Sequence, residues 1–274
     1  MRPDEVGAAA ERILVEIRKV IVGQERVLRE TLACFLAGGH VLLEGVPGTA
    51  KTLLVRALGR AVDAKFTRVQ FTPDLMPADV TGVNMFHQDE HAFRFHPGPV
   101  FTDLLLADEI NRAPAKTQSA LLEAMQERRV TVDGAERPLP PLFTAFATQN
   151  PVEYEGTYPL PEAELDRFLA KVLVGYPSEA EETAILDRHA AGFDAEREDT
   201  FGIARAVSPA QVLEMRQAVR QVLVEPGVRA YIVSILRATR EPGAIALGAS
   251  PRATVALFRI VRAGARSFTS SGVA

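Results

Sequence analysis

One stretch of the sequence has the residue types and spacing of a phosphate-binding loop. Gly45-Val46-Pro47-Gly48-Thr49-Ala50-Lys51-Thr52 lies between an apolar run and an expected helix, which is the context that a P-loop requires. The amides of such a loop and the positive end of the following helix face phosphate oxygens. Lys51 would contact the β- and γ-phosphates, and the Thr52 hydroxyl would bind Mg²⁺. The motif therefore predicts a triphosphate site.

Ala50 departs from the usual P-loop pattern, in which glycine precedes the lysine. Alanine tolerates helical backbone angles but not left-handed ones. We therefore expect helical angles at Ala50 and a loop that still binds phosphate. The alternative for the whole motif is a glycine-rich turn between a strand and a helix, with no ligand.

Two adjacent carboxylates end a second apolar run, Leu104-Leu105-Leu106-Ala107-Asp108-Glu109. Asp108 at the tip of a strand is placed to bind Mg²⁺ through water, and Glu109 to polarise the water that attacks the γ-phosphate. Either acid alone could simply be a solvated residue that caps a strand. Combined with the phosphate loop, the pair predicts a nucleoside triphosphatase.

Hydrophobic patterning places both motifs at the ends of strands. Strands are expected over five short apolar runs: residues 40–44, 66–71, 102–107, 142–148 and 171–174. Helical periodicity precedes the first run, over residues 25–37, and separates later ones, over residues 51–62 and 115–126. Strands that alternate with helices predict an α/β fold with a mainly parallel sheet. Two segments interrupt this order: an insertion at about 80–97, with a short hairpin near 83–95, and a hairpin at about 128–141.

The pattern changes after residue 177. Ser178 and Ser208 each begin a capping box, and Ser250-Pro251 opens a third helix. No convincing strand pattern follows. We therefore expect an α/β core over residues 1–177 and a helical lid over 178–274. The chain ends after Ser267 without a further helix, so we also expect the lid to be truncated at its C-terminus.

Composition excludes several classes of protein. The 274 residues are 47% hydrophobic and 24% charged, as in ordinary globular domains. Cys34 is the only cysteine, so an intrachain disulfide cannot form. The net charge of −4 argues against a protein that coats nucleic acid. No apolar run approaches the ~18 residues of a membrane span, and charged residues interrupt any export signal, so we expect a cytoplasmic protein without a membrane span.

Five motifs in order resemble the MoxR family of AAA+ ATPases: GVPGTAKT, LLLADEINRA, FATQNP, LPEAELDRF and GASPRA. The resemblance runs from Ile21 to about Arg262. It implies a P-loop AAA+ core, with a mainly parallel five-stranded sheet flanked by helices, followed by an all-α lid domain. It also implies ATP and Mg²⁺ as cofactors and a homo-oligomeric ring, expected to be a hexamer.

The resemblance also assigns roles to single residues. Asn150 matches the first sensor, which orients the lytic water; an Asn-Pro turn is the alternative. Arg167 matches the arginine finger that reaches a neighbouring subunit's γ-phosphate; the alternative is an intrachain ion pair with Asp166 or Glu164. Arg252 matches the second sensor, acting across the subunit interface, or else is a surface arginine.

Other segments match the family less specifically. Gly23 and Gln24 match the segment against adenine, although a turn between helices explains them almost equally well. Arg112 could face the interface, without a defined role. The insertion at 80–97 elaborates helix 2, and it and the hairpin at 128–141 match loops that face the pore and touch the substrate in related rings. The insertion's three histidines lack the spacing of a metal site, so solvated side chains are expected: His87, His91 and His96.

The function that the resemblance implies is the remodelling or activation of a protein complex, including cofactor or metal insertion, with a von Willebrand factor A domain protein as helper. Two alternatives remain. A nucleic-acid motor of the helicase-related AAA+ branch is weakly supported by three hairpin arginines, Arg128, Arg129 and Arg137. An ATP-gated interaction module with little turnover is opposed by the intact Glu109.

Overall fold

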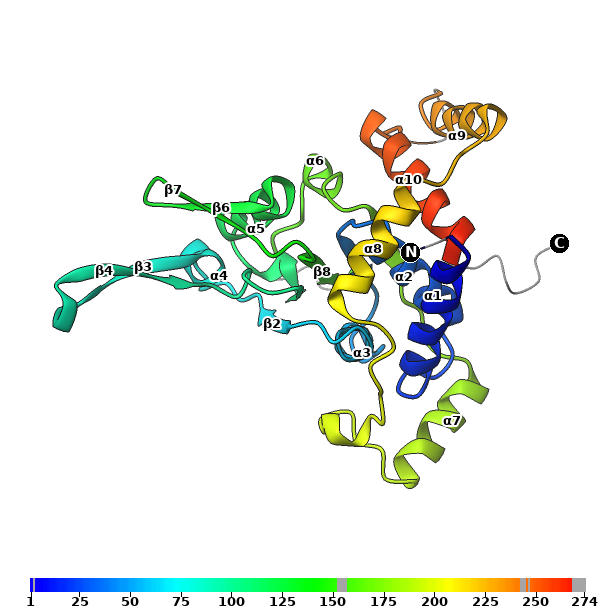
Figure 1. The fold of residues 1–274 in the computed structure, drawn as a ribbon, viewed down its shortest axis with the longest axis horizontal. Coiled ribbons are helices and arrows are strands. Elements are labelled where there is room, and N and C mark those ends of the chain that lie inside the picture. Colours follow the sequence, from blue (N-terminus) through cyan, green and yellow to red (C-terminus); the bar gives the residue numbers. More distant parts are fainter. Residues whose placement is uncertain (2, 152–156, 242–244, 246, 268–274) are drawn as a thin grey trace.

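A parallel five-stranded sheet forms the centre of the computed structural model, which describes residues 1, 3–151, 157–241, 245 and 247–267 (Figure 1). The strands are β1 (Val41–Glu44), β2 (Phe66–Gln70), β5 (Leu104–Asp108), β8 (Thr144–Gln149) and β9 (Ala170–Leu173). Their order across the sheet is β2-β5-β8-β1-β9. Each corresponds to one of the five apolar runs, so the predicted fold class is confirmed.

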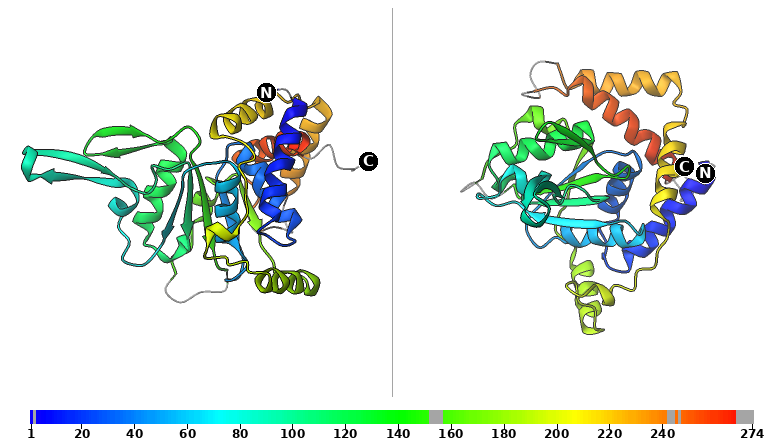
Figure 2. Two further views of the ribbon diagram at one scale, coloured as in Figure 1. Left: turned by 60° about the horizontal axis from the view of Figure 1, so that its bottom comes forward. Right: turned by 60° about the vertical axis from the view of Figure 1, so that its left-hand side comes forward.

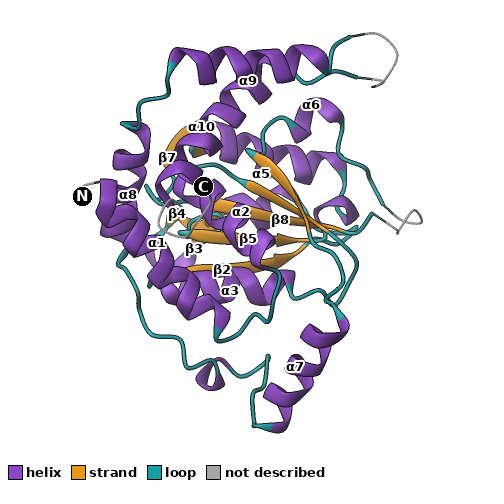
Figure 3. Cartoon of the chain, turned by 90° about the vertical axis from the view of Figure 1, so that its right-hand side faces the viewer, coloured by secondary structure: helices purple, strands orange, loops and turns teal. Residues whose placement is uncertain are grey.

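Helices cover both faces of this sheet (Figure 3), which is why the central strands β1 and β5 read as nearly continuous apolar runs. The long helices of the α/β part are α1 (Pro3–Arg18), α2 (Glu25–Leu36), α3 (Lys51–Ala61) and α5 (Ala115–Glu127). Alternate residues of β5 enter different clusters. Leu104 and Leu106 pack with α1, α2 and α3, whereas Leu105 and Ala107 pack with α5. The carboxyl ends of the strands are thereby fixed at one edge.

Two hairpins project from the body of the molecule (Figures 1 and 2). The first follows a short helix, α4 (Pro77–Thr81), and consists of β3 (Gly82–His87), a 3-10 turn at Gln88–Glu90 and β4 (Ala92–Pro97); the second consists of β6 (Arg129–Val132) and β7 (Ala135–Pro138). Asn84 Nδ2 donates to Asp133 Oδ2 at 2.6 Å and joins them. Both predicted hairpins are confirmed. His87 and His96 of the first meet with their Nε2 atoms 2.8 Å apart.

The C-terminal part is helical. It contains α6 (Glu162–Leu165), α7 (Glu179–Ala190), a 3-10 turn at Glu198–Thr200, α8 (Pro209–Arg220), α9 (Pro226–Ala238) and α10 (Pro251–Ser267). Both predicted capping boxes form, at Ser178 and Ser208. The third expected helix, at Ser250-Pro251, is α10, and α9 is a further helix whose start was not predicted from the sequence. Helices α8 and α10 contact α1 and α2 and share their apolar cluster.

Two expectations concern the chain as a whole. The expected truncation of the lid depends on residues 268–274, which lie outside the described residues. Among the helices that the structure describes, none is long and apolar enough to cross a membrane.

His40, just before β1, is a fully enclosed polar residue of the core. Its Nδ1 accepts a hydrogen bond from the Ala145 amide at 2.9 Å, so Nε2 carries the proton and donates to the Met125 carbonyl at 3.1 Å. Burial, reinforced by the nearby Arg128 charge, lowers the pKa of His40 to about 3. The imidazole is therefore neutral in the folded protein at ordinary pH.

We expect His40 to make the fold acid-sensitive. Between pH 6.5 and 5 the unfolded chain binds a proton at this histidine and the folded chain does not, so stability falls as the pH falls, by about 2 kcal/mol at pH 5. Urea unfolding at pH 7 and pH 5 measures this loss. His40→Gln, which keeps a neutral donor and acceptor, should shrink it. An identical pH dependence in both proteins would contradict the assignment.

Candidate functional site

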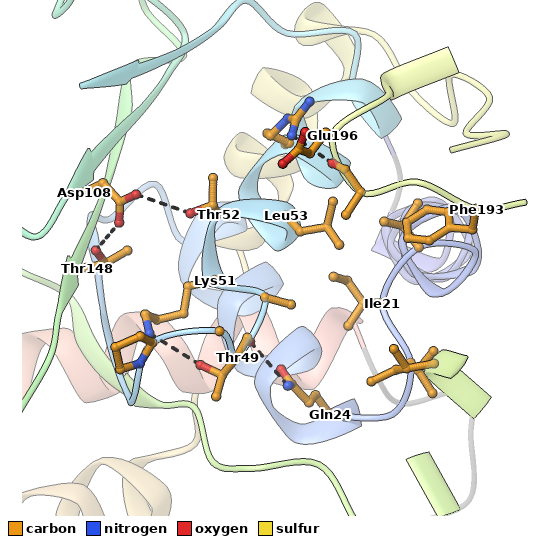
Figure 4. Close-up of a pocket in the computed structure, with 18 of the residues that line it drawn as sticks. Ile21, Gln24, Thr49, Lys51, Thr52, Leu53, Asp108, Thr148, Phe193 and Glu196 are labelled. Carbon is orange, nitrogen blue, oxygen red and sulfur yellow. Dashed lines mark hydrogen bonds between the residues drawn. The ribbon is translucent and has the colours of Figure 1, made fainter. Parts of the chain in front are cut away.

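A cleft of about 490 Å³ opens at the carboxyl edge of the sheet. Its walls are the loop before α3, the ends of β5 and β8, the residues between α1 and α2, and α7 with the segment after it. Figure 4 shows Asp108 and Thr52 on one side of the cleft, and Ile21 and Phe193 on the other. One end of the cleft is thus polar and the other apolar, as a nucleotide requires.

The phosphate loop wraps the start of α3. Gly48 has φ of +81° and open space where a Cβ would be, so a ligand can approach the backbone closely. Lys51 Nζ donates to the carbonyls of Gly45 at 2.9 Å and Val46 at 2.7 Å. Burial lowers the pKa of Lys51, an effect opposed by the carboxylates that face it. A phosphate beside this ammonium would favour its charged form.

The backbone of Ala50 differs from the prediction. It adopts left-handed angles, φ 62° and ψ 19°, as the residue that precedes the first turn of α3. The expectation of helical angles was wrong because the turn from the loop into α3 imposes the left-handed conformation at this position, although alanine carries a Cβ. For a residue with a Cβ, the left-handed conformation costs on the order of 1–2 kcal/mol.

Ala50→Gly should therefore stabilise the protein by about 1 kcal/mol, since glycine adopts these angles without strain. For a chain of this size that corresponds to a rise in Tm of about 2–4 °C. Differential scanning calorimetry measures the shift. Ala50→Val is the matched control and should lower Tm, because a β-branched residue is still less tolerant of positive φ. A fall in Tm for the glycine variant would show that Ala50 is unstrained.

Asp108, at the end of β5, is the centre of the polar side. Its Oδ1 accepts a hydrogen bond from Thr148 Oγ1 at 2.5 Å, and Thr52 Oγ1 lies 3.4 Å from Oδ2. Arg68 of β2 forms an ion pair with Oδ2, with Nη2 at 2.6 Å. A hydroxyl and a carboxylate oxygen beside a phosphate loop fit Mg²⁺, which binds through one or two protein oxygens plus phosphates and water. Arg68 already pairs with Oδ2 of this carboxylate. Its contact with Asp108 would therefore have to loosen when a metal ion binds there.

Glu109 directly follows the strand and has left-handed angles, φ 55° and ψ 50°. A 3-10 turn at Ile110–Arg112 comes next. The Glu109 amide donates to Thr148 Oγ1 at 2.8 Å, and Oε2 accepts from Gln70 Nε2 at 2.6 Å and lies 3.2 Å from Arg112 Nε. Strained non-glycine residues of this kind are typical of functional sites. Asn150, after β8, is buried and lines the same cleft.

Gln24 connects the apolar end of the cleft to the phosphate loop. Its side chain donates to the Thr49 carbonyl at 3.4 Å, and its backbone amide donates to Glu181 Oε1 of α7 at 3.2 Å. Gly23 does not line the cleft, but a Cβ there would lie 1.6 Å from Glu181 Oε1. The segment is both the turn between α1 and α2 and one wall of the cleft.

Arg167 and Arg252 are located elsewhere. Neither is among the described residues that line the cleft. Arg167 follows α6 and is half-buried, and among the described residues no carboxylate lies within 4.0 Å of its guanidinium. Arg252, in the first turn of α10, is exposed and lines a separate 240 Å³ pocket with Asp166 and Phe168. The structure thus places the two arginine segments together and apart from their own chain's cleft.

Several contacts of the site were missed in the sequence. Arg68 and Gln70 reach the two carboxylates because β2 pairs with β5 in a register that puts Gln70 opposite Asp108. Only the strand order could have predicted this. Ile185 and His189 of α7 line the apolar end with Phe193, although nothing in the spacing of α7 distinguishes a cleft-facing side.

Comparisons with known proteins agree with this site. Residues 40–170 match the model of the ATPase family associated with various cellular activities (AAA). The chain is 45% identical to the uncharacterized protein YeaC of Bacillus subtilis, over 94% of this chain and 78% of that one. It is 44% identical to the chaperone MoxR1 of Mycobacterium tuberculosis, over 92% and 67%. The crystal structure of a candidate ATPase from Cytophaga hutchinsonii superposes with a TM-score of 0.85 at 40% identity, covering 96% of this chain and 81% of that one.

Proposed function

The chain belongs to the MoxR family of AAA+ ATPases, and from this premise we propose that it hydrolyses ATP in a Mg²⁺-dependent reaction to remodel or activate a protein complex. The observation that carries the proposal is the convergence of Lys51, Thr52, Asp108 and Glu109 on one cleft. A protein that only binds ATP would not need Glu109, a carboxylate in the position of a general base beside the proposed metal ligands.

Each group of residues in the cleft has a separate proposed role in phosphoryl transfer. The loop amides and Lys51 bind the phosphates, and Glu109 with Asn150 orients and polarises the attacking water. Thr52 and Asp108 would hold Mg²⁺, which when bound neutralises charge on the phosphate oxygens. In this structure Gln70 and Arg112 contact Glu109 Oε2, so part of the carboxylate must change partners before it serves as a base.

Catalysis in this proposal requires a second subunit. Arg167 and Arg252 do not line the cleft of their own chain, which supports a role at a neighbour's γ-phosphate in a homo-oligomeric ring, proposed to be a hexamer. Each subunit of the ring is proposed to consist of two domains, an α/β core over residues 1–177 and a helical lid over residues 178–274. We also propose that the protein acts in the cytoplasm on a protein client, inserts a cofactor or metal into it, and works with a von Willebrand factor A domain partner. Of these points, the relative named as a chaperone supports only the protein client.

The nucleic-acid motor is less well supported. Arg129 Nη1 lies 3.3 Å from Glu136 Oε2, Arg137 stacks on the Phe95 ring at 3.9 Å, and Arg128 donates to the Gly38 carbonyl at 2.9 Å. Each hairpin arginine is therefore engaged by the chain itself and not arranged as a free basic stripe for phosphates.

Phosphate release with Mg²⁺-ATP, measured over a series of protein concentrations with molar mass recorded on the same samples, tests this proposal. Specific activity should rise as a hexamer-sized species forms, and Lys51→Ala should abolish it at every concentration. Activity that is constant in a monomer would move Arg167 and Arg252 to intrachain roles. ATP binding without any phosphate release would favour the ATP-gated module.

A further inference from the structure

Four arginines gather at the end of the sheet opposite to the nucleotide cleft. They come from the C-terminal cap of α5, from α8 and from α10: Arg128, Arg216, Arg220 and Arg259. Three of them donate to carbonyls at or just after the end of α2. We call them the arginine cluster. It adjoins Gly38, which precedes β1, whereas the phosphate loop follows β1, so about 13 Å of strand separates the two sites.

The inner two arginines are engaged by the protein. Arg216 is buried and donates to the Phe35 carbonyl at 3.0 Å, to the Leu142 carbonyl at 3.4 Å and to Thr144 Oγ1 at 2.7 Å. All three of its nitrogens therefore have partners. Arg128 donates to the carbonyls of Phe143 and Gly38.

The outer two arginines retain donors. Arg259 is half-buried, and its Nη2 donates to the Ala37 carbonyl at 2.8 Å. Arg220 is exposed, and a Cβ on Gly38 would lie 3.9 Å from its Nη2. Because a guanidinium carries five N–H donors, both of these side chains can bind a further acceptor beside Gly38.

The cluster has no counter-ion within the described part of the chain. No carboxylate of the described residues lies within 4.0 Å of any of the four guanidiniums. Burial, and then the charges of the other three, lowers the pKa of Arg216 to about 9. Burial, and then the Arg220 charge, also lowers the pKa of Arg259. The C-terminus of α2 offers only about half a negative charge. The local excess of positive charge therefore favours the binding of an anion at this end of the sheet.

We propose that Arg220 and Arg259 bind a multiply charged phosphate anion beside Gly38, with Arg128 and Arg216 supplying the positive potential behind it. Two guanidinium forks match a tetrahedral oxyanion, because each can donate two parallel hydrogen bonds. Phosphate is favoured over a single carboxylate because several positive charges meet here. The bound anion would connect α8 and α10 to the end of α2.

Isothermal titration of Lys51→Ala, the full chain with an impaired phosphate loop, tests the site with inorganic tripolyphosphate. Adding Arg220→Ala, which alters an exposed side chain, should weaken binding at least about tenfold, the value of one lost charged hydrogen-bond pair. Adding Arg237→Ala, on the exposed side of α9, is the charge-matched control and should change nothing. Parallel titration with ADP shows whether the phosphate belongs to a free polyphosphate or to a nucleotide. If ADP binds no more tightly than tripolyphosphate, the site recognises phosphates alone. If ADP binds more tightly and this affinity depends on Arg220, the site recognises a nucleotide.

Three results would overturn the proposal. The first is the absence of tripolyphosphate binding to Lys51→Ala at millimolar concentration. The second is an equal effect of Arg220→Ala and Arg237→Ala, which would reduce the interaction to net charge. The third is a glutamate-rich peptide that binds as tightly with the same dependence on Arg220, which would make the cluster a docking site for acidic protein segments.

Discussion

Replacing Glu109 by glutamine is expected to lower the rate of ATP hydrolysis about 10²–10⁴-fold, the usual contribution of a general base. Glutamine keeps the size of the side chain and can still contact Gln70, but it cannot polarise water as a carboxylate does. ATP affinity should stay within about threefold of the parent, because Lys51 and the loop amides that bind phosphate are unchanged. Phosphate release and binding of a fluorescent ATP analogue measure the two effects separately.

Lys51→Ala provides the contrast to Glu109→Gln. It should lose nucleotide binding as well as turnover, since its ammonium lies in the loop, within 2.9 Å of the Gly45 carbonyl. A Glu109→Gln protein that binds ATP poorly would mean that the carboxylate helps to shape the site. Unchanged turnover would remove Glu109 from catalysis and leave the strain at its backbone without a catalytic explanation.

The parts of the site that sequence predicts best are those carried by contiguous residues. The loop ending in Lys51 and Thr52 and the strand ending in Asp108 are local patterns, and burial on both faces of the sheet makes their strands apolar throughout. Asn150 was assigned through the family resemblance, from the motif FATQNP that contains it. The cleft brings all of these side chains together.

The missed features depend on contacts between distant segments. Arg68 meets Asp108 only because two strands far apart in the chain are neighbours in the sheet. Helix α9 begins with Glu225-Pro226, without the serine cap that marks α7 and α8, and only Ile232 and Leu236 of its apolar side chains are buried. No serine cap therefore marked the start of this helix in the sequence. At Ala50 the geometry of the loop overrides the preference of the residue.

Arg167→Ala is expected to lower turnover by about 10³-fold or more while ATP binding is retained, because an arginine finger acts on the transition state. ATP binding should be retained because Arg167 does not line the cleft of its own chain. Phosphate release and ATP-analogue binding, recorded with molar mass, would show that the loss is not a failure to assemble.

A mixture of two inactive variants decides whether Arg167 acts on a neighbour. In rings formed from equal amounts of Glu109→Gln and Arg167→Ala subunits, about a quarter of the sites combine an intact Glu109 with an intact Arg167 from the adjacent chain. Mixing should therefore restore a substantial part of the parent activity. Glu109→Gln mixed with the double variant is the control and should recover none, because no site then has a base. If the first mixture is as inactive as its components, Arg167 completes its own subunit's site, and the segment after α6 must move to bring it there.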